Sequence, residues 1–71
     1  MSNRTRLTPS RFKISDIVEI SSSMHSQLSG RRARIVEIRE NRYSQTLDKY
    51  VVLLEHSSEQ KMLWDIELRA K

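Results

Sequence analysis

The alternation of apolar and polar residues predicts a chain of short strands joined by polar turns. Residues 12–20, FKISDIVEI, place apolar side chains mostly at every second position, as a half-buried strand does. Asp16 and Ile17 break this alternation. We therefore predict a turn at Ser15-Asp16 and, after it, a strand of about five residues.

Residues 21–30 form the next predicted loop, because they contain five serines and Gly30, the only glycine of the chain. Met24 and Leu28 are four positions apart in this segment. That spacing fits one short helical turn with both side chains packed inward, and it fits an irregular loop equally well.

Residues 31–40 are predicted to form the second strand, followed by a turn region at 41–47. The apolar residues of this strand fall on both odd and even positions: Ala33, Ile35, Val36 and Ile38. A straight, half-buried strand does not show this pattern, whereas a long, bent or bulged strand does.

Residues 48–55 give the strongest strand signal, because the five consecutive positions from Tyr50 to Leu54 are apolar. Such a run indicates burial on both faces, or one face in the core and the other on a partner. A homodimer or another protein docked on the Val51 and Leu53 face would explain the run. Curvature of the protein's own sheet would explain it as well.

The last predicted strand, residues 61–68, follows a polar turn at 56–60. Its apolar residues recur at every second position: Met62, Trp64, Ile66 and Leu68. This pattern predicts an inner face with Trp64 as the largest core residue; the alternative is an exposed Trp64 that anchors a ligand or partner. Two short strands joined by a turn of 3₁₀ helix at 64–67 would also fit.

The spacing of these segments favours an all-β fold. Residues 31–42 and 60–71 contain good helix formers, which leaves a helical alternative. However, β-branched residues concentrate in the central segments, and turns recur about every 8–12 residues, as in small sandwiches and barrels. We predict a small β-barrel.

The length of the chain limits it to one small domain. Its 71 residues allow a single core, and no cysteine is available for a disulfide or a thiolate metal site. His25 and His56 lack ligand partners at a useful spacing, so we expect no metal and no cofactor. No apolar run has the length of a membrane span or signal peptide, and we expect a cytoplasmic protein without membrane contact.

The positive charge is concentrated at the N-terminus. The net charge is +4, residues 1–13 carry four basic residues and no acid, and residues 14–71 carry nine of each sign. We therefore expect a flexible basic arm at 1–11 in front of a folded, neutral domain at 12–69. Such an arm is attracted to phosphates, or it serves only to keep the chain in solution.

The order of the segments resembles a small SH3-like barrel, in particular the KOW-type barrel of ribosomal and transcription-elongation proteins. Residues 12–20 are similar to that family's opening, an aromatic or aliphatic residue followed by Gly-Asp-x-Val-x-Val. Asp16, Val18 and Ile20 match this pattern, and Ser15 replaces the glycine. The resemblance implies a barrel of about five strands over residues 12–69.

Two further segments carry the same resemblance. Residues 30–38, GRRARIVEI, resemble the KOW core in Gly30, Arg34 and the aliphatic residues, while Ala33 stands where a second glycine is usual. Residues 64–68, WDIEL, resemble the short turn and final strand that close such barrels, with Leu68 facing in. SH3-like barrels serve many functions, so the fold alone selects none of them.

Basic residues and one exposed aromatic residue suggest contact with nucleic-acid phosphates. The candidate binding residues are Arg4, Arg6, Arg11, Lys13, Arg31, Arg32, Arg34, Arg42 and Tyr43. Arginine binds phosphate through two parallel donors, and a tyrosine in a polar turn can stack on a base. The alternative is an ordinary solvated face, with the arginines neutralised by Glu37, Glu40 and Glu55 across the strands.

The sequence does not indicate an enzyme. Serines, histidines and acids are all present, but no nucleophile elbow or glycine-rich phosphate loop accompanies them. We therefore expect a non-enzymatic module that binds RNA or DNA without strong sequence preference. The alternative is a protein-interaction adaptor or small oligomer that uses the Val51 and Leu53 face or the WDIEL edge.

Overall fold

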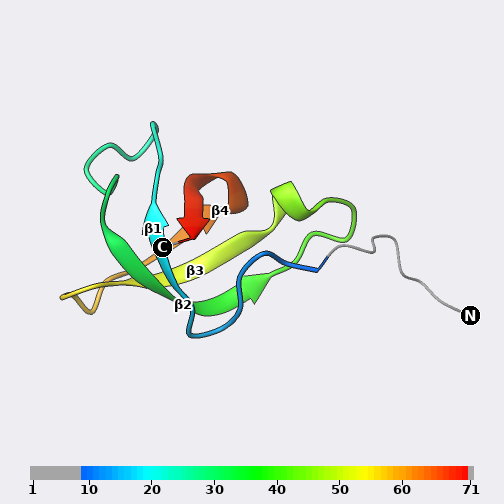
Figure 1. Cartoon of the computed structure of the whole chain (residues 1–71), viewed down its shortest axis with the longest axis horizontal. Coiled ribbons are helices and arrows are strands. Elements are labelled where there is room, and N and C mark those ends of the chain that lie inside the picture. Colours follow the sequence, from blue (N-terminus) through cyan, green and yellow to red (C-terminus); the bar gives the residue numbers. More distant parts are fainter. Residues whose placement is uncertain (1–8, 71) are drawn as a thin grey trace, which may run out of the picture.

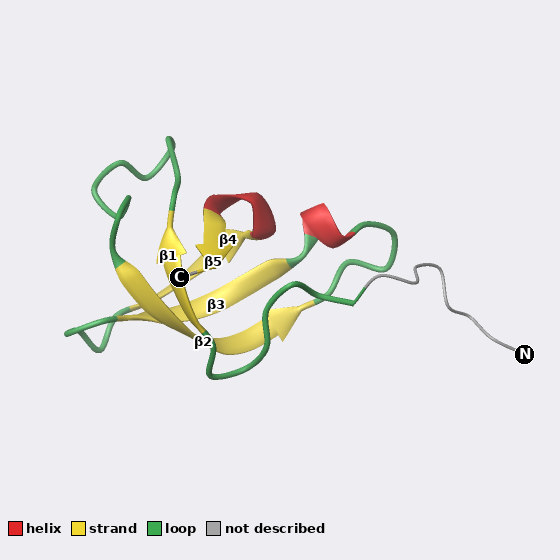
Figure 2. Cartoon of the chain, viewed as in Figure 1, coloured by secondary structure: helices red, strands yellow, loops and turns green. Residues whose placement is uncertain are grey.

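Five antiparallel strands form one sheet in the computed structural model, which describes residues 9–70 (Figure 1). The strands are β1 (Ile17–Ile20), β2 (Arg32–Arg39), β3 (Lys49–Leu54), β4 (Gln60–Trp64) and β5 (Leu68–Ala70). Two turns of 3₁₀ helix, η1 (Gln45–Leu47) and η2 (Asp65–Glu67), precede β3 and β5 (Figure 2). The strand order is β4-β3-β2-β1-β5, so the all-β prediction is confirmed.

The core lies on one face of this sheet. In β3 the side chains of Tyr50, Val52 and Leu54 are buried, while those of Val51 and Leu53 on the opposite face are half-buried. The remaining core residues come from the other strands and the segment before β1: Phe12, Val18, Ile20, Ala33, Ile35, Leu63 and Leu68. The apolar run in β3 is therefore a core face backed by a partly exposed outer face.

A bulge in β2 explains why its apolar residues occupy both parities. The pairing with β3 shifts by one residue, since Ile35 lies opposite Val52 but Glu37 lies opposite Val51. Val36 is the extra residue, and beyond it Ile38 packs against the core. The bent or bulged second strand is thus confirmed.

The predicted inner face of residues 61–68 is wrong for β4. Leu63 lies opposite Tyr50 and is buried, whereas Trp64 lies opposite Lys49 and is 41% exposed. Met62 and Ile66 are exposed as well. The 3₁₀ turn η2 then changes the parity, so Leu68 returns to the core as expected.

The loop between β1 and β2 buries only one of its two apolar residues. Leu28 packs partly against the core, but Met24 is 83% exposed, so the inward helical turn of both residues is wrong. Gly30 ends this loop with a φ of 88°, and its N–H donates to the Ile20 carbonyl at 2.7 Å. That left-handed conformation favours glycine.

Within residues 9–70, no helix has the length and apolar character needed to span a membrane.

We predict that Tyr50 makes the fold sensitive to alkali. Burial raises the pKa of its phenol above the ordinary value of 10.0, and the hydroxyl also accepts a hydrogen bond from the Phe12 N–H at 3.4 Å. The unfolded chain ionises at lower pH than the folded one, so stability is retained below pH 10 and falls as the pH rises above it. The measurement is tyrosinate absorbance together with circular dichroism, on a Tyr43→Phe variant in which Tyr50 is the only tyrosine.

In that variant, ionisation and loss of the β-sheet spectrum should coincide. Ionisation near pH 10 with the sheet intact would contradict the assignment. A Tyr50→Phe variant serves as the control and should lose the matching alkaline transition.

Candidate nucleic-acid interface

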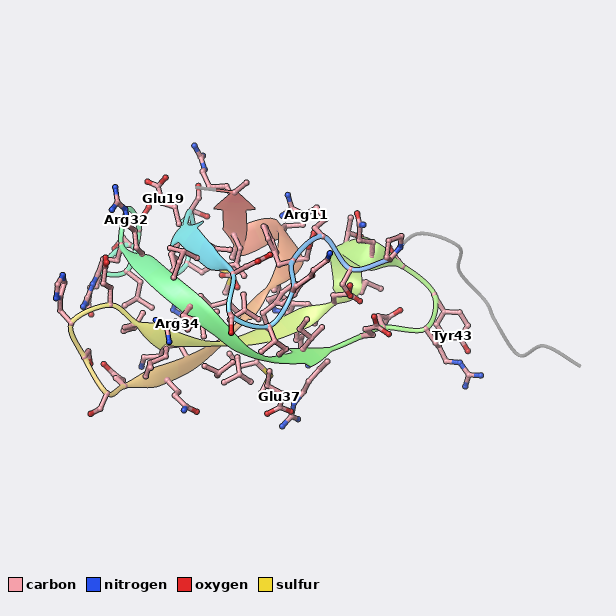
Figure 3. All side chains as sticks on the ribbon, turned by 60° about the horizontal axis from the view of Figure 1, so that its bottom comes forward. Arg11, Glu19, Arg32, Arg34, Glu37 and Tyr43 are labelled. Carbon is pink, nitrogen blue, oxygen red and sulfur yellow. The ribbon has the colours of Figure 1, made fainter. Side chains whose placement is uncertain are left out.

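The seven predicted contact residues within residues 9–70 do not form a single face, and Arg4 and Arg6 lie outside the described residues. Figure 3 shows Arg32 and Tyr43 on opposite sides of the molecule, with Arg11 between them. Arg31, Arg32 and Arg34 lie at the start of β2, while Arg42 and Tyr43 lie in the loop beyond its last residue. At about 3.3 Å per residue, the two ends of this eight-residue strand are roughly 20 Å apart.

The arginines at the start of β2 point into solvent without acidic partners. Arg31, Arg32 and Arg34 are exposed, and within residues 9–70 none of them has a carboxylate oxygen closer than 4.0 Å. Opposite them in β1, Glu19 lies across from Arg32 and Ile17 across from Arg34 (Figure 3). Their guanidinium donors are available to an incoming anion.

Within residues 9–70, Glu37, Glu40 and Glu55 form none of the ion pairs expected with Arg31, Arg32 and Arg34. Glu37 accepts instead from Arg39 in its own strand, with Arg39 Nε 2.9 Å from Glu37 Oε2. Glu40 accepts from the Ser10 hydroxyl at 3.1 Å. Glu55 follows β3 with its backbone N–H on the Arg32 carbonyl, and it forms no ion pair within residues 9–70.

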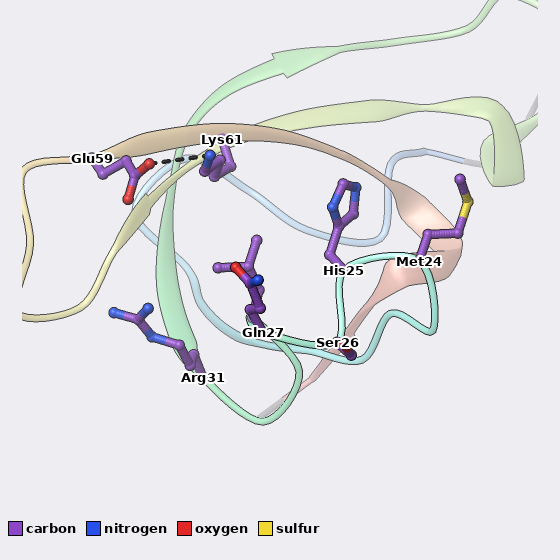
Figure 4. Close-up of a pocket in the computed structure, with 8 residues that line it drawn as sticks. Met24, His25, Ser26, Gln27, Arg31, Glu59 and Lys61 are labelled. Carbon is purple, nitrogen blue, oxygen red and sulfur yellow. Dashed lines mark ion pairs between the residues drawn. The ribbon is translucent and has the colours of Figure 1, made fainter.

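The surface around these arginines is hollowed. A hollow of about 380 Å³ is lined by Arg31, by His25 of the β1–β2 loop, and by Lys61 and Glu59, whose Nζ and Oε2 lie 3.1 Å apart. Figure 4 shows these residues around the hollow. Further hollows of about 290 and 230 Å³ share Arg32 and His56 on their walls. Each of the three arginines lines at least one hollow of this end.

The chemistry of this end has to be inferred from its own geometry. No family model, curated protein or solved structure matches the chain. Unpaired, fork-shaped donors beside open hollows suit a bidentate anion such as a phosphate. Within the described part of the chain, no three His, Asp or Glu side chains come together as a metal site would require.

The charge at the surface differs from the charge balance of the sequence. Residues 9–70 contain ten Lys and Arg side chains and nine Asp and Glu side chains. Three of those carboxylates, on Asp48, Asp65 and Glu67, are buried, and Arg11 is bound to Asp65. Nine cations and six carboxylates are left for the surface of the described part. The folded domain is therefore more basic outside than its sequence indicates.

The segment before β1 lies at the other end of the sheet. Gln45 of η1 donates to the Pro9 carbonyl at 2.6 Å, and the Ser10 hydroxyl donates to Asp48 Oδ2 at 2.9 Å. Both partners belong to the stretch between β2 and β3 that also carries Tyr43. The described start of the chain therefore lies beside the Tyr43 loop, away from Arg31.

Arg11 is engaged in holding the fold together. Its Nε donates to both carboxylate oxygens of buried Asp65, at 3.0 and 3.2 Å, and its Nη2 donates to the carbonyls of Asp65 and Leu68. Its guanidinium carbon also lies 4.6 Å from the centre of the Phe12 ring. These contacts use the donors that the sequence analysis assigned to phosphate.

Side-chain hydrogen bonds hold the loop that carries Tyr43. Asn41 Oδ1 accepts from the N–H groups of Tyr43 and Ser44 at 2.8 and 3.0 Å, and Asp48 accepts from Asn41. The Tyr43 ring is 70% exposed, with the Arg42 guanidinium carbon 5.6 Å from its centre. Lys13, near the start of β1, is exposed and donates only its backbone N–H to Asp16 Oδ2.

Ser22 and Glu67 form a buried polar cluster that the sequence pattern does not predict. The Ser22 hydroxyl donates to Glu67 Oε2 at 2.6 Å, and the Trp64 N–H donates to Glu67 Oε1 at 2.9 Å. His25 Nε2 lies 3.9 Å from the same carboxylate. The serine is bound to the acid and not to the imidazole, so this arrangement fixes the loop onto η2 and does not activate a nucleophile. The burial of Glu67 depends on the 3₁₀ turn η2, which brings its carboxylate to the Trp64 N–H and the Ser22 hydroxyl. The alternation of apolar and polar residues in the sequence does not indicate it.

We predict that Arg11→Ala destabilises the protein far more than loss of an unpaired arginine. Removing the guanidinium leaves the buried Asp65 carboxylate and two carbonyls without their donors. Arg11 is itself partly exposed, so the expected cost is only about 2 kcal/mol, or roughly 10 °C in Tm. Thermal unfolding followed by circular dichroism measures it, with Arg31→Ala as the matched control. Equal midpoints for the two variants would refute the structural role of Arg11.

Proposed function

We propose that this protein is a non-enzymatic binding module that contacts nucleic-acid phosphates without strong sequence preference. The observation that carries the proposal is the group Arg31, Arg32 and Arg34, exposed, unpaired within the described residues, and bordered by hollows. Phosphate contacts carry little sequence information by themselves, which agrees with binding without strong sequence preference.

Burial of acids inside the fold supports this proposal. Asp48, Asp65 and Glu67 accept hydrogen bonds inside the protein, and none of them is paired directly with Arg31, Arg32 or Arg34. The acids at the arginine end include Glu19, opposite Arg32, and Glu55 and Glu59, which line hollows beside the arginines. They limit the local positive charge, so the contact involves only a few phosphates, about three.

We propose further that the sheet is a small SH3-like barrel of the KOW type. The strand order β4-β3-β2-β1-β5, with η2 between the two outermost strands, supports this class. Ser15, which replaces the family's glycine, has a φ of 79°, a conformation that glycine adopts readily. Ala33, at the second glycine position, is buried in the core, so its methyl group does not obstruct an approaching ligand.

A protein-interaction role is the second candidate, and the outer face of the sheet favours it. Val51 and Leu53 are half-buried there, and Met62 and Trp64 beside them are exposed. If this face binds a second copy, mass from light scattering will rise with protein concentration and Val51→Ser will abolish the rise. A constant monomer mass would remove the homodimer from consideration.

We predict a salt-dependent affinity for nucleic acid that depends on the three arginines. The logarithm of affinity should fall linearly with the logarithm of salt concentration, with a slope of about −2 to −3 for roughly three phosphates. Each of Arg31→Ala, Arg32→Ala and Arg34→Ala should make the slope less steep by about 1. Fluorescence anisotropy of a labelled oligonucleotide between about 50 and 200 mM salt measures it.

Arg39→Ala is the matched control. It removes the same charge from the same strand, but Arg39 is paired with Glu37, so its slope should stay close to that of the parent chain. Deleting residues 1–8, which spares Arg11, tests the contribution of Arg4 and Arg6 separately. Absence of binding to both RNA and DNA at about 50 mM salt would overturn the proposal.

A further inference from the structure

The outer face of β3 and β4 brings an aromatic ring, a cation and apolar side chains together. In the β3–β4 pairing, Lys49 lies opposite Trp64, Val51 opposite Met62 and Leu53 opposite Gln60. Tyr50, Val52 and Leu54 of β3 and Leu63 of β4 point into the core, so the residues of these three pairs share the outer face. Trp64 is the only tryptophan of the chain, and sequence periodicity alone assigned it to the interior.

Lys49 and Trp64 form a cation–π pair on this face. The Lys49 Nζ lies 4.6 Å from the centre of the indole ring, and the ring remains 41% exposed. A hollow of about 150 Å³ adjoins the ring and is also lined by Met24 and Ile66, both exposed. The ammonium lies over the ring, so a flat ligand would stack on the part of the indole that Lys49 leaves exposed, close to that positive charge.

The charges around this face complement an anion. On the outer face of β2, Arg34 lies opposite Leu53, Glu37 opposite Val51, and Arg39 opposite Lys49. Glu37 is the one acid among these outer positions of β2, β3 and β4, and it is paired with Arg39. Arg34 and Lys49 thus remain as positive charges on either side of the apolar side chains.

We infer that this face binds single-stranded nucleic acid, with a base stacked on Trp64 and backbone phosphates near Lys49 and Arg34. This inference rests on the proposed function and names its substrate class. A stacking ring flanked by cations is the combination that recognises unpaired bases, because every base has a stacking face and every nucleotide carries a phosphate. In a duplex the bases are already stacked on one another, and only the phosphates would be available to this face.

The arrangement also connects the two ends of the protein. Arg34 belongs to the arginine end, whereas Lys49 follows η1 and the loop that presents Tyr43. A single strand lying along β3 would pass from the Arg31–Arg34 group toward Trp64. Phosphate contact and base stacking would then be supplied by different ends of one continuous surface.

The test uses the intrinsic fluorescence of Trp64 in the full chain. The ligands are an oligothymidylate of about twelve nucleotides, an abasic strand of equal length and charge, and the corresponding duplex, all at about 50 mM salt. We expect the oligothymidylate to bind roughly tenfold more tightly than the abasic strand and the duplex, and to quench the fluorescence.

Substitutions at Trp64 and Met62, both in β4, distinguish base stacking from general apolar contact. Trp64→Leu should reduce oligothymidylate affinity roughly tenfold, measured by anisotropy, and leave the abasic strand unaffected. Trp64→Phe keeps an aromatic ring and should retain most of the preference, which shows that the site still folds. Met62→Ala, a similarly exposed apolar residue of the same face, is the matched control and should change affinity less than twofold.

Each failure has a distinct meaning. Equal affinity for all three ligands with unchanged fluorescence would overturn the single-strand inference and leave phosphate binding intact. Equal losses in Met62→Ala and Trp64→Leu, or equally tight binding of polyglutamate, would overturn it in favour of a protein partner. Absence of binding to any nucleic acid would overturn the proposed function and this inference together.

Discussion

The hydrogen bonds of Arg11 fix the position of the closing turn η2 and of the start of the chain against the sheet. The outermost strands β4 and β5 are connected through η2, and the Arg11 guanidinium binds the Asp65 carboxylate, the Asp65 carbonyl and the Leu68 carbonyl around that turn. The Arg11 guanidinium also lies over the Phe12 ring. That ring packs edge-on against Tyr50 in the core, with 5.4 Å between the two ring centres. One arginine thus joins the start of the chain, the closing turn and the core.

The position of Arg11 determines where positive charge is available at the surface. Because Arg11 is held at η2, the described start of the chain lies against the 41–48 stretch, and the Arg31–Arg34 group remains at the opposite end. The buried acids complete the effect. Asp48 and Glu67 receive several short hydrogen bonds inside the protein, which offset the cost of removing a polar group from water. The surface is left with an excess of cations although the sequence of the folded part is balanced.

The sequence patterns predicted the strands well and their faces less well. Turn residues and β-branched runs located β1 to β4, the alternative of a 3₁₀ turn at 64–67 matches η2, and the mixed parity of residues 31–40 indicated the bulge now seen at Val36. In residues 61–68, however, the even positions are all apolar and the odd positions hold one apolar residue, Leu63, so the local pattern predicted the wrong inner face for β4. The choice between Leu63 and Trp64 depends on the register against Tyr50 and Lys49, a long-range contact that no local pattern encodes.

The candidate site shows the same division between local and long-range information. The cluster Arg31, Arg32 and Arg34 is evident from composition, and the exposure of Arg32 and Arg34 follows from strand alternation around Ala33. Arg31 has the same parity as Ala33 but lies before β2 begins. Whether acids neutralise these arginines depends on which side chains pair in the folded protein. Glu37 is paired with Arg39 in its own strand, and Arg11 is paired with Asp65, which is distant in the sequence. The pairing of Lys49 with Trp64 likewise exists only once β3 and β4 are in register.

Backbone amide NMR during titration with a short oligonucleotide at low salt tests whether phosphate is bound by the arginines at the start of β2. We expect the largest chemical-shift changes on Gly30 to Arg34 and on the facing turn at His56, and we expect them to disappear as salt is raised. Changes confined to β5 and η2, with residues 30–34 unaffected, would contradict this expectation.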